Sequence, residues 1–522
     1  MASRAQPLGA SIWIGGASCA LLLFLTLGTL GAVASRADWT NGLTSYDWAA
    51  ARFTIFQAVL SALLSIGLAI PTARALARRQ FLGRKLLILI LGAPFILPVI
   101  VAILGIISVY GTRGIVSQAL QAIGLPSPDI YGLAGILLAH VFFNLPLATR
   151  LILQGWLSIP SERFRLADSL GFSPNNIQRH LEWPMLRQTV PPVFVVIFLI
   201  CLTSFTVVLA LGGGPKSTTL ELAIYQAFRF DFDLGKAALL GLLQFGICGI
   251  AGLAMFWLKL PAGQGQGLDR SIKRQDANST VLRGLDTAIL LGVSIFLIAP
   301  LGSIIFQGIW YVSDLPILIW LAAFRSILMA ICSTILCVIM ALGLAHLSQH
   351  LKTRGVFVEV FGFLILAASP LVMGTGLFII FFPLIRPSDM ALPITVIVNA
   401  AMALPFVLAA VLPALEQSNS SFGRLADSLG LVGWQRFTKL TLPRIRKTLG
   451  FGAGLSAALA MGDLGVVTLF GTGDATTLPL EMYRLMGAYR LDQAAGAALL
   501  LLGISLVLFW TLDTLGKHNA DA

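Results

Sequence analysis

Charged side chains are scarce in this 522-residue sequence, at 11% of positions against 57% for hydrophobic residues. Soluble globular proteins have about a quarter of their residues charged, so the deficit excludes that class. The mean hydropathy of +0.89 points the same way. Because a membrane-spanning helix needs about 20 apolar residues, the chain has room for about a dozen. We therefore expect an all-α polytopic membrane protein.

Groups that carry catalysis or bind metals are also few. The five cysteines lie in apolar runs without a CxxC pair, which is typical of small buried side chains. His140 and His346 stand alone on apolar runs, where we expect them to be packed and hydrogen-bonded. Asp231 and Asp233 have no third ligand nearby, and segment 212–217 lacks the glycine before lysine of a phosphate-binding loop. The sequence therefore argues against an enzyme and predicts no metal site and no cofactor bound by this chain.

Twelve apolar runs predict about 12 transmembrane helices, and an even number returns the chain to the side where it began. The side that holds both termini then has 25 of the 35 lysines and arginines, and the other side has 10. Such a bias marks the cytoplasmic side, so we expect both termini in the cytoplasm. The predicted spans are 12–34, 54–76, 86–110, 131–153, 191–211, 237–258, 286–310, 325–347, 358–384, 391–413, 449–471 and 493–514.

Two clusters of basic residues contribute to the net charge of +12. Both fall at cytoplasmic ends of spans or in cytoplasmic loops, where we interpret them as anchors against an anionic lipid leaflet. The charge therefore predicts the lipid bilayer as a partner and does not require nucleic acid. The first cluster is Arg74, Arg78, Arg79, Arg84 and Lys85, and the second is Lys259, Arg270, Lys273, Arg274 and Arg283.

The chain contains an internal repeat. The heptapeptide Arg165–Gly171 recurs letter for letter as Arg424–Gly430, 259 positions later, and the same offset relates Pro184 to Pro443. We infer a tandem duplication of a six-helix unit joined by a flexible Gly-rich linker. Six spans per unit give both halves the same orientation and leave a pathway between them. The predicted units are a first half at 1–260, a cytoplasmic linker at 261–284 and a second half at 285–522.

Both copies of the repeat lie in loops predicted to be cytoplasmic, at 158–184 and 416–443. Ser161 is placed to cap a short helix, and Gly171 would end it because glycine adopts the left-handed conformation without strain. The Ser-Pro pair at 173–174 would start the next helix. We expect the short helix to offer a small apolar face to a partner's groove. That face comprises Leu166, Ala167 and Leu170 in the first copy, and Leu425, Ala426 and Leu429 in the second.

These loops resemble the EAA motif of ABC-importer permeases: Glu-Ala-Ala, three residues, Gly, nine residues, then Ile-x-Leu-Pro. Arginine stands here where the family most often has glutamate, and leucine replaces the first alanine. The resemblance implies the transmembrane domain of a type I ABC importer, in which each loop docks onto one subunit of a separate ATPase dimer. The implied coupling residues are Arg165, Leu166, Ala167, Asp168, Gly171 and Pro184, with Arg424, Leu425, Ala426, Asp427, Gly430 and Pro443.

The segments 203–231 and 462–483 resemble the permeases of thiamine and thiamine pyrophosphate importers, and this resemblance covers both halves nearly end to end. Ferric-iron importer permeases are fused in the same way and are the alternative, although segment 483–492 looks like the thiamine type. The resemblance implies inward transport of thiamine and phosphorylated thiamine by alternating access in a bacterial inner membrane. It also implies a periplasmic substrate-binding protein and two copies of a cytoplasmic ATPase as partners.

Four residues are expected along the substrate pathway or its gate: Ser204, Asp463, Tyr225 and Tyr483. Asp463 is the one carboxylate that falls well inside a predicted span, away from the span ends, with Ser204 at the matching first-half position. A charge there costs about 2.5–3.5 kcal/mol and normally lines a cavity or pairs. Either the carboxylate favours the thiazolium cation of thiamine, or it helps to close a periplasmic gate. An ion-coupled secondary transporter is less favoured, because such proteins bury several ionisable residues.

Overall fold

The computed structural model describes residues 10–40, 42–92, 94, 96–257, 280–351, 355–365, 368–470 and 476–517. Throughout these residues the chain forms helices joined by turns, and it has no β-strand there. Eleven described helices are long and apolar enough to cross a membrane, which confirms the expected all-α polytopic fold. Residues 258–279, which include most of the linker predicted at 261–284, lie outside the described residues. We call the residues before this segment the first half and those after it the second half.

The helices of the two halves follow a similar order. The first half contains α1 (Ala10–Leu23), η1 (Phe24–Gly28), α2 (Thr29–Arg36), α3 (Ser45–Arg78), α4 (Arg84–Ile90), α5 (Val99–Tyr110), α6 (Ile115–Ala122), α7 (Leu133–Leu157), α8 (Ser161–Ser169), α9 (Pro174–Ile177), η3 (Gln178–Glu182), α10 (Trp183–Leu202), α11 (Thr206–Leu211), η4 (Pro215–Ser217), α12 (Leu220–Arg229) and α13 (Leu234–Trp257). The second half contains α14 (Thr280–Tyr311), α15 (Ile317–Leu351), α16 (Gly355–Leu364), α17 (Pro370–Phe381), α18 (Pro387–Ser428), α19 (Gly433–Arg436), η8 (Phe437–Thr441), α20 (Leu442–Met461), α21 (Gly465–Phe470), α22 (Leu478–Gly487) and α23 (Leu491–Lys517).

The third predicted span of each half is not one continuous helix. Predicted span 86–110 divides into α4 and α5, and 358–384 divides into α16 and α17. Pro98 immediately precedes α5, and Pro370 is the first residue of α17. Proline lacks an N–H donor and disfavours helix at the preceding residue, so each break falls before it. The predictions of an uninterrupted span over 86–110 and over 358–384 are therefore both wrong.

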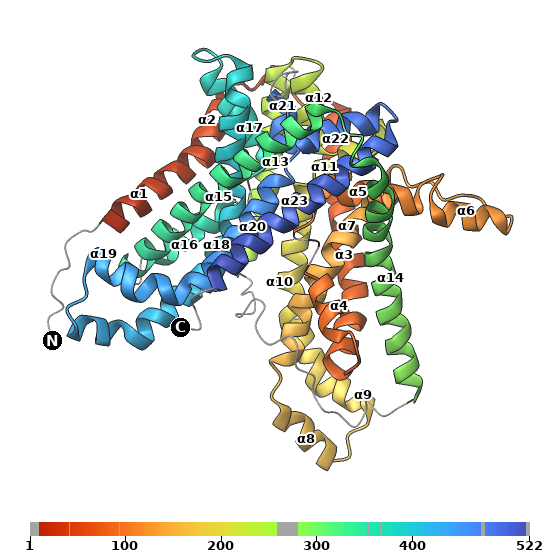
Figure 1. Cartoon of the computed structure of the whole chain (residues 1–522), viewed down its shortest axis with the longest axis vertical. Coiled ribbons are helices and arrows are strands. Elements are labelled where there is room, and N and C mark those ends of the chain that lie inside the picture. The colour runs from red at the N-terminus through yellow and green to blue at the C-terminus, as the bar shows by residue number, and fades with distance from the viewer. Residues whose placement is uncertain are drawn as a thin grey trace.

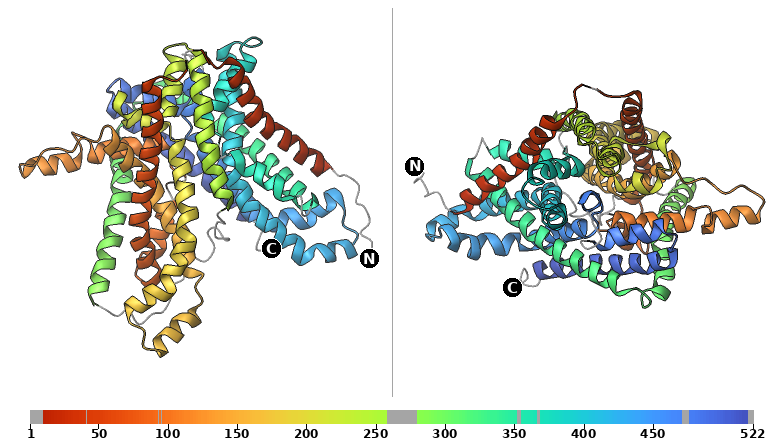
Figure 2. Two further views of the ribbon diagram at one scale, coloured as in Figure 1. Left: turned by 180° about the vertical axis from the view of Figure 1, so that it is seen from behind. Right: turned by 90° about the horizontal axis from the view of Figure 1, so that it is seen from above.

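The helices form two arms that diverge from a common end (Figure 1). Helices α11, α12, α21 and α22 lie at the end where the arms meet. The region of α8 and α9 lies at the tip of one arm and α19 lies near the tip of the other, and the view from behind shows the same V shape (Figure 2). The two copies of the repeat are therefore held apart, each at its own tip.

Each arm includes the first helix of the opposite half. Helix α1 packs on α15, whereas α14 packs on α5 and α3. Both crossings are close: a Cβ added to Gly15 would lie 2.5 Å from the Gly343 oxygen, and one added to Gly105 would lie 2.5 Å from the Pro300 oxygen. Small residues let membrane helices approach in this way. The exchange of first helices therefore depends on glycine at both crossings.

Candidate functional site

The first copy of the repeat forms α8 and ends in a tight turn. Gly171 has φ +65°; its N–H donates to the Asp168 oxygen at 3.1 Å, and the Phe172 N–H donates to the Ala167 oxygen at 2.9 Å. These two bonds form a Schellman cap, which favours glycine at the left-handed position. In the second copy, where Gly430 also has φ +65°, the equivalent bonds measure 3.2 and 3.0 Å. The predicted helix stop is confirmed in both copies.

The two copies begin differently. A break at Pro160 separates α8 from α7, whereas the second copy is the continuous end of α18. Asn419 stands at the position that corresponds to Pro160 and, unlike proline, supplies the N–H that a helix needs. The predicted cap by Ser161 is wrong, because Pro160 holds the cap position and the Ser161 hydroxyl donates to Glu162 Oε1 at 3.1 Å. The repeated heptapeptides are thus joined to their arms in two ways.

Leucines alone form the exposed apolar face of the repeat. In each copy two leucines four residues apart are more than half exposed, whereas the alanine that follows the first of them is buried. Successive residues of a helix point about 100° apart, so the alanine turns toward the body of the protein and does not belong to this face, contrary to the prediction. The exposed leucines are Leu166 (59%), Leu170 (63%), Leu425 (54%) and Leu429 (65%), and the buried alanines are Ala167 (3%) and Ala426 (2%).

Charged side chains border this apolar face. Arg165 pairs with Glu162 at 2.8 Å, and Asp427 pairs with Arg436 at 2.8 Å. Arg424 is exposed. Ion pairs in such exposed places contribute little to stability, so these groups remain available to a partner.

The chain that follows each turn is also matched. Ser173 accepts a hydrogen bond from the Asn176 N–H and Pro174 begins α9, as predicted. A five-residue π segment comes next in both halves, η3 in the first and η8 in the second, and Pro184 and Pro443 lie in the first turn of the helix that follows. Single π turns within helices are frequent at functional sites.

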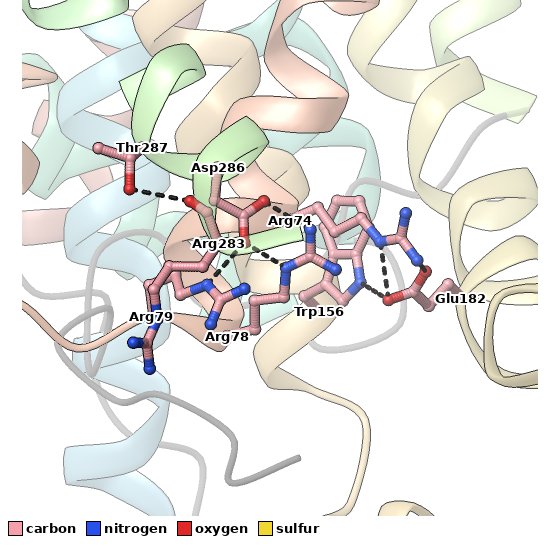
Figure 3. Close-up of polar contacts among 8 residues, drawn as sticks. All are labelled: Arg74, Arg78, Arg79, Trp156, Glu182, Arg283, Asp286 and Thr287. Atoms are coloured by element: carbon pink, nitrogen blue, oxygen red, sulfur yellow. Dashed lines mark hydrogen bonds and ion pairs between the residues drawn. The ribbon is translucent and has the colours of Figure 1, made fainter. Parts of the chain in front are cut away.

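A buried carboxylate fixes the first π segment to its arm (Figure 3). Glu182 Oε2 lies 2.9 Å from an Arg74 guanidinium nitrogen, and the Trp156 indole N–H donates to Glu182 Oε1 at 3.3 Å. The Glu182 side chain is only 1% exposed. Since Arg74 is on α3 and Trp156 is on α7, this carboxylate joins the segment beyond α8 to two long helices of the arm.

A second ion pair joins α3 to α14 (Figure 3). Asp286 accepts from Arg78 Nε and from Arg79 Nε, each at 2.7 Å. The Arg78 and Asp286 side chains are 4% and 3% exposed. The interpretation of this basic cluster as a lipid anchor is therefore wrong for Arg74, Arg78 and Arg79, which pair within the protein. No local pattern in the sequence indicates the pairing, because Asp286 lies more than 200 positions away in the other half.

Ser204 and Asp463 lie on matching breaks where the halves meet. Ser204 is between α10 and α11, and Asp463 is between α20 and α21. A Cβ added to Gly462 would lie 2.9 Å from Pro98 Cα, and one added to Gly465 would lie 3.7 Å from a ring carbon of Phe205. The second-half break thus contacts the first half on both sides of Asp463.

His140 completes a hydrogen-bonded chain in the first half. Its Nδ1 lies 2.9 Å from Ser61 Oγ and its Nε2 lies 2.9 Å from Ser204 Oγ. His346 Nδ1 lies 2.8 Å from the Leu342 oxygen. The expectation that both histidines are packed and hydrogen-bonded is confirmed.

Tyr225 and Tyr483 lie on the corresponding helices α12 and α22, neither of which is among the candidate membrane spans. The Tyr225 ring packs edge-on against Phe205, with ring centroids 5.2 Å apart. Burial raises the pKa of Tyr483, and the charge of an ionised Tyr225 raises it further. Because Tyr225 affects the pKa of Tyr483, the two tyrosines, which belong to opposite halves, lie near each other at the end where the arms meet.

Glu221 is a buried carboxylate that sequence reasoning missed. It is 0% exposed and accepts from Gln244 Nε2 at 3.2 Å and from Ser369 Oγ at 2.9 Å. Ser369 caps α17, so Glu221 links α12 of the first half to the second half. It was overlooked because α12 lies outside the predicted spans. Among the described residues, no group of three His, Cys, Asp or Glu side chains is placed to hold a metal ion.

Similarity to known proteins extends over nearly the whole chain. The family model described as binding-protein-dependent transport system inner membrane component matches residues 334–518. The chain is 38% identical to the thiamine transport system permease protein of Escherichia coli (strain K12), with 99% of both chains covered. It is 36% identical to that of Brucella abortus (strain 2308), with 97% of this chain and 96% of the other covered. It is 37% identical to the thiamine transport system permease protein of Haemophilus influenzae, with 88% of this chain and 87% of the other covered. The chain therefore belongs to the family of binding-protein-dependent inner-membrane permeases that includes these thiamine transport proteins.

Proposed function

We propose that this chain is the membrane-spanning subunit of an ATP-driven importer that moves thiamine and phosphorylated thiamine inward. The observation that carries the proposal is similarity to thiamine transport permeases over nearly the entire length of both proteins. A likeness of this extent includes the segments at the interface of the halves as well as the repeat. The chain supplies the pathway, ATP hydrolysis resides in a partner chain, and a separate binding protein delivers the solute.

The ATPase partner docks at the two tips, one copy on α8 and one on the end of α18. Support comes from the matched pairs of exposed leucines, because apolar side chains held in water at two capped helix ends suit the groove of a partner. Charged side chains border the exposed leucines at both tips. The tips, both termini and the repeats then lie in the cytoplasm, and the common end of the arms lies in the periplasm.

The buried ion pairs suit the transmission of movement from tip to arm. A displacement of α8 reaches α3 through Glu182 and Arg74, and reaches α14 through Arg78 and Asp286. Closure of an ATPase dimer would draw the tips together and open the common end, which is alternating access. Ser204, Asp463, Tyr225 and Tyr483 then line the pathway or its gate where the halves meet.

Uptake of labelled thiamine tests this proposal, in cells that lack their own importer and express this chain with its binding protein and ATPase. The double variant Leu166→Glu with Leu425→Glu is expected to lose uptake and co-purification of the ATPase. Leu125→Glu is the control, because Leu125 is also half exposed (50%) but lies between α6 and α7, far from both tips. Uptake of ferric iron without thiamine would overturn the substrate, and uptake without the ATPase would overturn the importer mechanism.

A further inference from the structure

Three polar residues of the first half have counterparts in the second half that are bonded differently. In the first half, His140 bridges Ser61 and Ser204 through two contacts of 2.9 Å, so the set satisfies itself. Asn399 and Asp463 stand 259 positions after His140 and Ser204, which is the offset of the repeat. The second-half set is Ser333 on α15, Asn399 on α18 and Asp463 between α20 and α21.

The match of Ser333 with Ser61 rests on a shared contact. Thr54 on α3 accepts from the backbone N–H of the first residue of α12, and Ser326 on α15 accepts from that of the first residue of α22, both at 2.9 Å. Seven residues further along the two helices stand Ser61 and Ser333. The two serines therefore occupy the same place on corresponding helices.

The second-half set leaves polar atoms without partners. Ser333 Oγ, Asn399 Nδ2 and Asp463 Oδ2 are buried and have no hydrogen bond with any described residue. The Asn399 side chain and the Val466 backbone N–H both lie beside Asp463 and interact with its carboxylate, but neither contact has the distance and angle of a hydrogen bond. Asp463 Oδ1 accepts from the Gly465 N–H at 3.1 Å. Asparagine is shorter than histidine and does not bridge its neighbours as His140 does.

Buried polar atoms without a partner in the protein indicate that a bound molecule supplies the missing hydrogen bonds. Ser333 and Asn399 are 0% and 7% exposed, and buried polar groups in proteins are almost always hydrogen-bonded. The set also adjoins the interface of the halves, because the residues that flank Asp463 contact Pro98 and Phe205 of the first half. An occupant can therefore arrive from the pathway between the halves.

We propose that Ser333, Asn399 and Asp463 form the binding site for a cationic, hydrogen-bond-donating part of the transported solute. This inference rests on the proposed import function. A carboxylate favours a positive charge strongly where water is excluded, and the unpartnered Ser333 hydroxyl can accept from a donor of the solute. In the first-half set, by contrast, no buried side-chain atom lacks a partner, so we expect the solute to bind on the second-half side of the pathway.

The test is the concentration dependence of labelled thiamine uptake by the full complex in proteoliposomes. Asp463→Asn keeps the shape of the side chain and removes its charge. We expect the KM for thiamine uptake to rise about tenfold or more, because that is the cost of losing one hydrogen bond to a charged group. Ser333→Ala is expected to raise KM a few-fold without lowering the unfolding temperature. Its matched control is Ser61→Ala, which takes a partner from His140 and is expected to lower the unfolding temperature with KM unchanged.

Each result decides the proposal. An unchanged KM in both second-half variants would overturn it, since the three groups would then hold ordered water only, and an equal rise in Ser61→Ala would overturn the assignment to one half. If Asp463→Asn fails to assemble, Asn399→His replaces it: by supplying the first-half residue it should close the chain, stabilise the protein and raise KM. A wild-type complex that binds its ATPase but takes up no thiamine would instead overturn the proposed function, and this inference with it.

Discussion

Arg78 on α3 donates from Nε to Asp286 on α14 at 2.7 Å, and both side chains are almost completely buried. The contact spans the two halves of the sequence and lies where the exchanged first helix meets its arm. Arg79 pairs with the same carboxylate. One carboxylate therefore pairs with two guanidinium groups that have little access to water.

Asp286→Ala is expected to destabilise the protein by about 3–5 kcal/mol, because it removes one partner of a buried ion pair. The measurement is the thermal unfolding midpoint of the purified protein in detergent. Asp314→Ala serves as the control, since Asp314 is exposed beyond the other end of the same helix. Equal midpoints for the two variants would contradict the idea that the pair holds α14 against the arm.

Gly171→Val and Gly430→Val are expected to weaken ATPase binding about tenfold. A β-branched residue at φ +65° is strained by roughly 1–2 kcal/mol, which would unwind the Schellman cap and tilt the exposed leucines. Co-purification and titration of the ATPase measure the effect. Gly124→Val is the matched control, because Gly124 has φ +78° with open space around it and lies in the turn after α6. A similar loss in that control would mean that strain anywhere in the fold, not the docking cap, reduces binding.

Local signals in the sequence predicted the helix stop at Gly171 and the cap by Ser173, but not the contacts between halves. The helix ends at Gly171 and Gly430 follow from the preference for glycine at the left-handed position after a helix. Both copies of the repeat contain this glycine. A separate short helix starting near Ser161 was predicted, and α8 begins at that residue. The continuity of the second copy with α18 was not predicted, because the heptapeptides are identical and only their flanks differ.

The buried ion pairs and Glu221 had no such signal. An arginine near the end of an apolar span looks the same whether it faces lipid headgroups or a carboxylate of another helix, and only packing decides between them. Glu221 lies on a ten-residue helix that is too short to register as a span. Its partner Ser369 is in the other half, so the pairing depends on how the two halves pack together, which the sequence pattern does not predict.

Gly105→Val and Gly15→Val are expected to destabilise the exchanged helices by about 1–3 kcal/mol or more, the cost of overpacking a tight contact. At both positions the nearest atom to an added Cβ is a backbone oxygen at 2.5 Å, which a side-chain rotation does not relieve. Thermal unfolding again supplies the measurement. Gly67→Val controls for the loss of a helical glycine, because nothing lies within 4 Å of its Cβ position. If the control were destabilised as much, the crossings would have no special need for glycine.

Pro160→Ala is expected to join α7 and α8 into one helix, as the second copy already is in α18. The substitution restores the missing N–H donor and removes the steric bias against helix at Ile159. Spin labels at positions 133 and 169 would then approach a separation of about 54 Å, the length of 36 helical residues. Asn419→Pro is the reverse change and should shorten the separation between labels at 392 and 428. A distance unchanged by Pro160→Ala would mean that the break is fixed by packing beneath α8, where Phe164 is 1% exposed, and not by the proline.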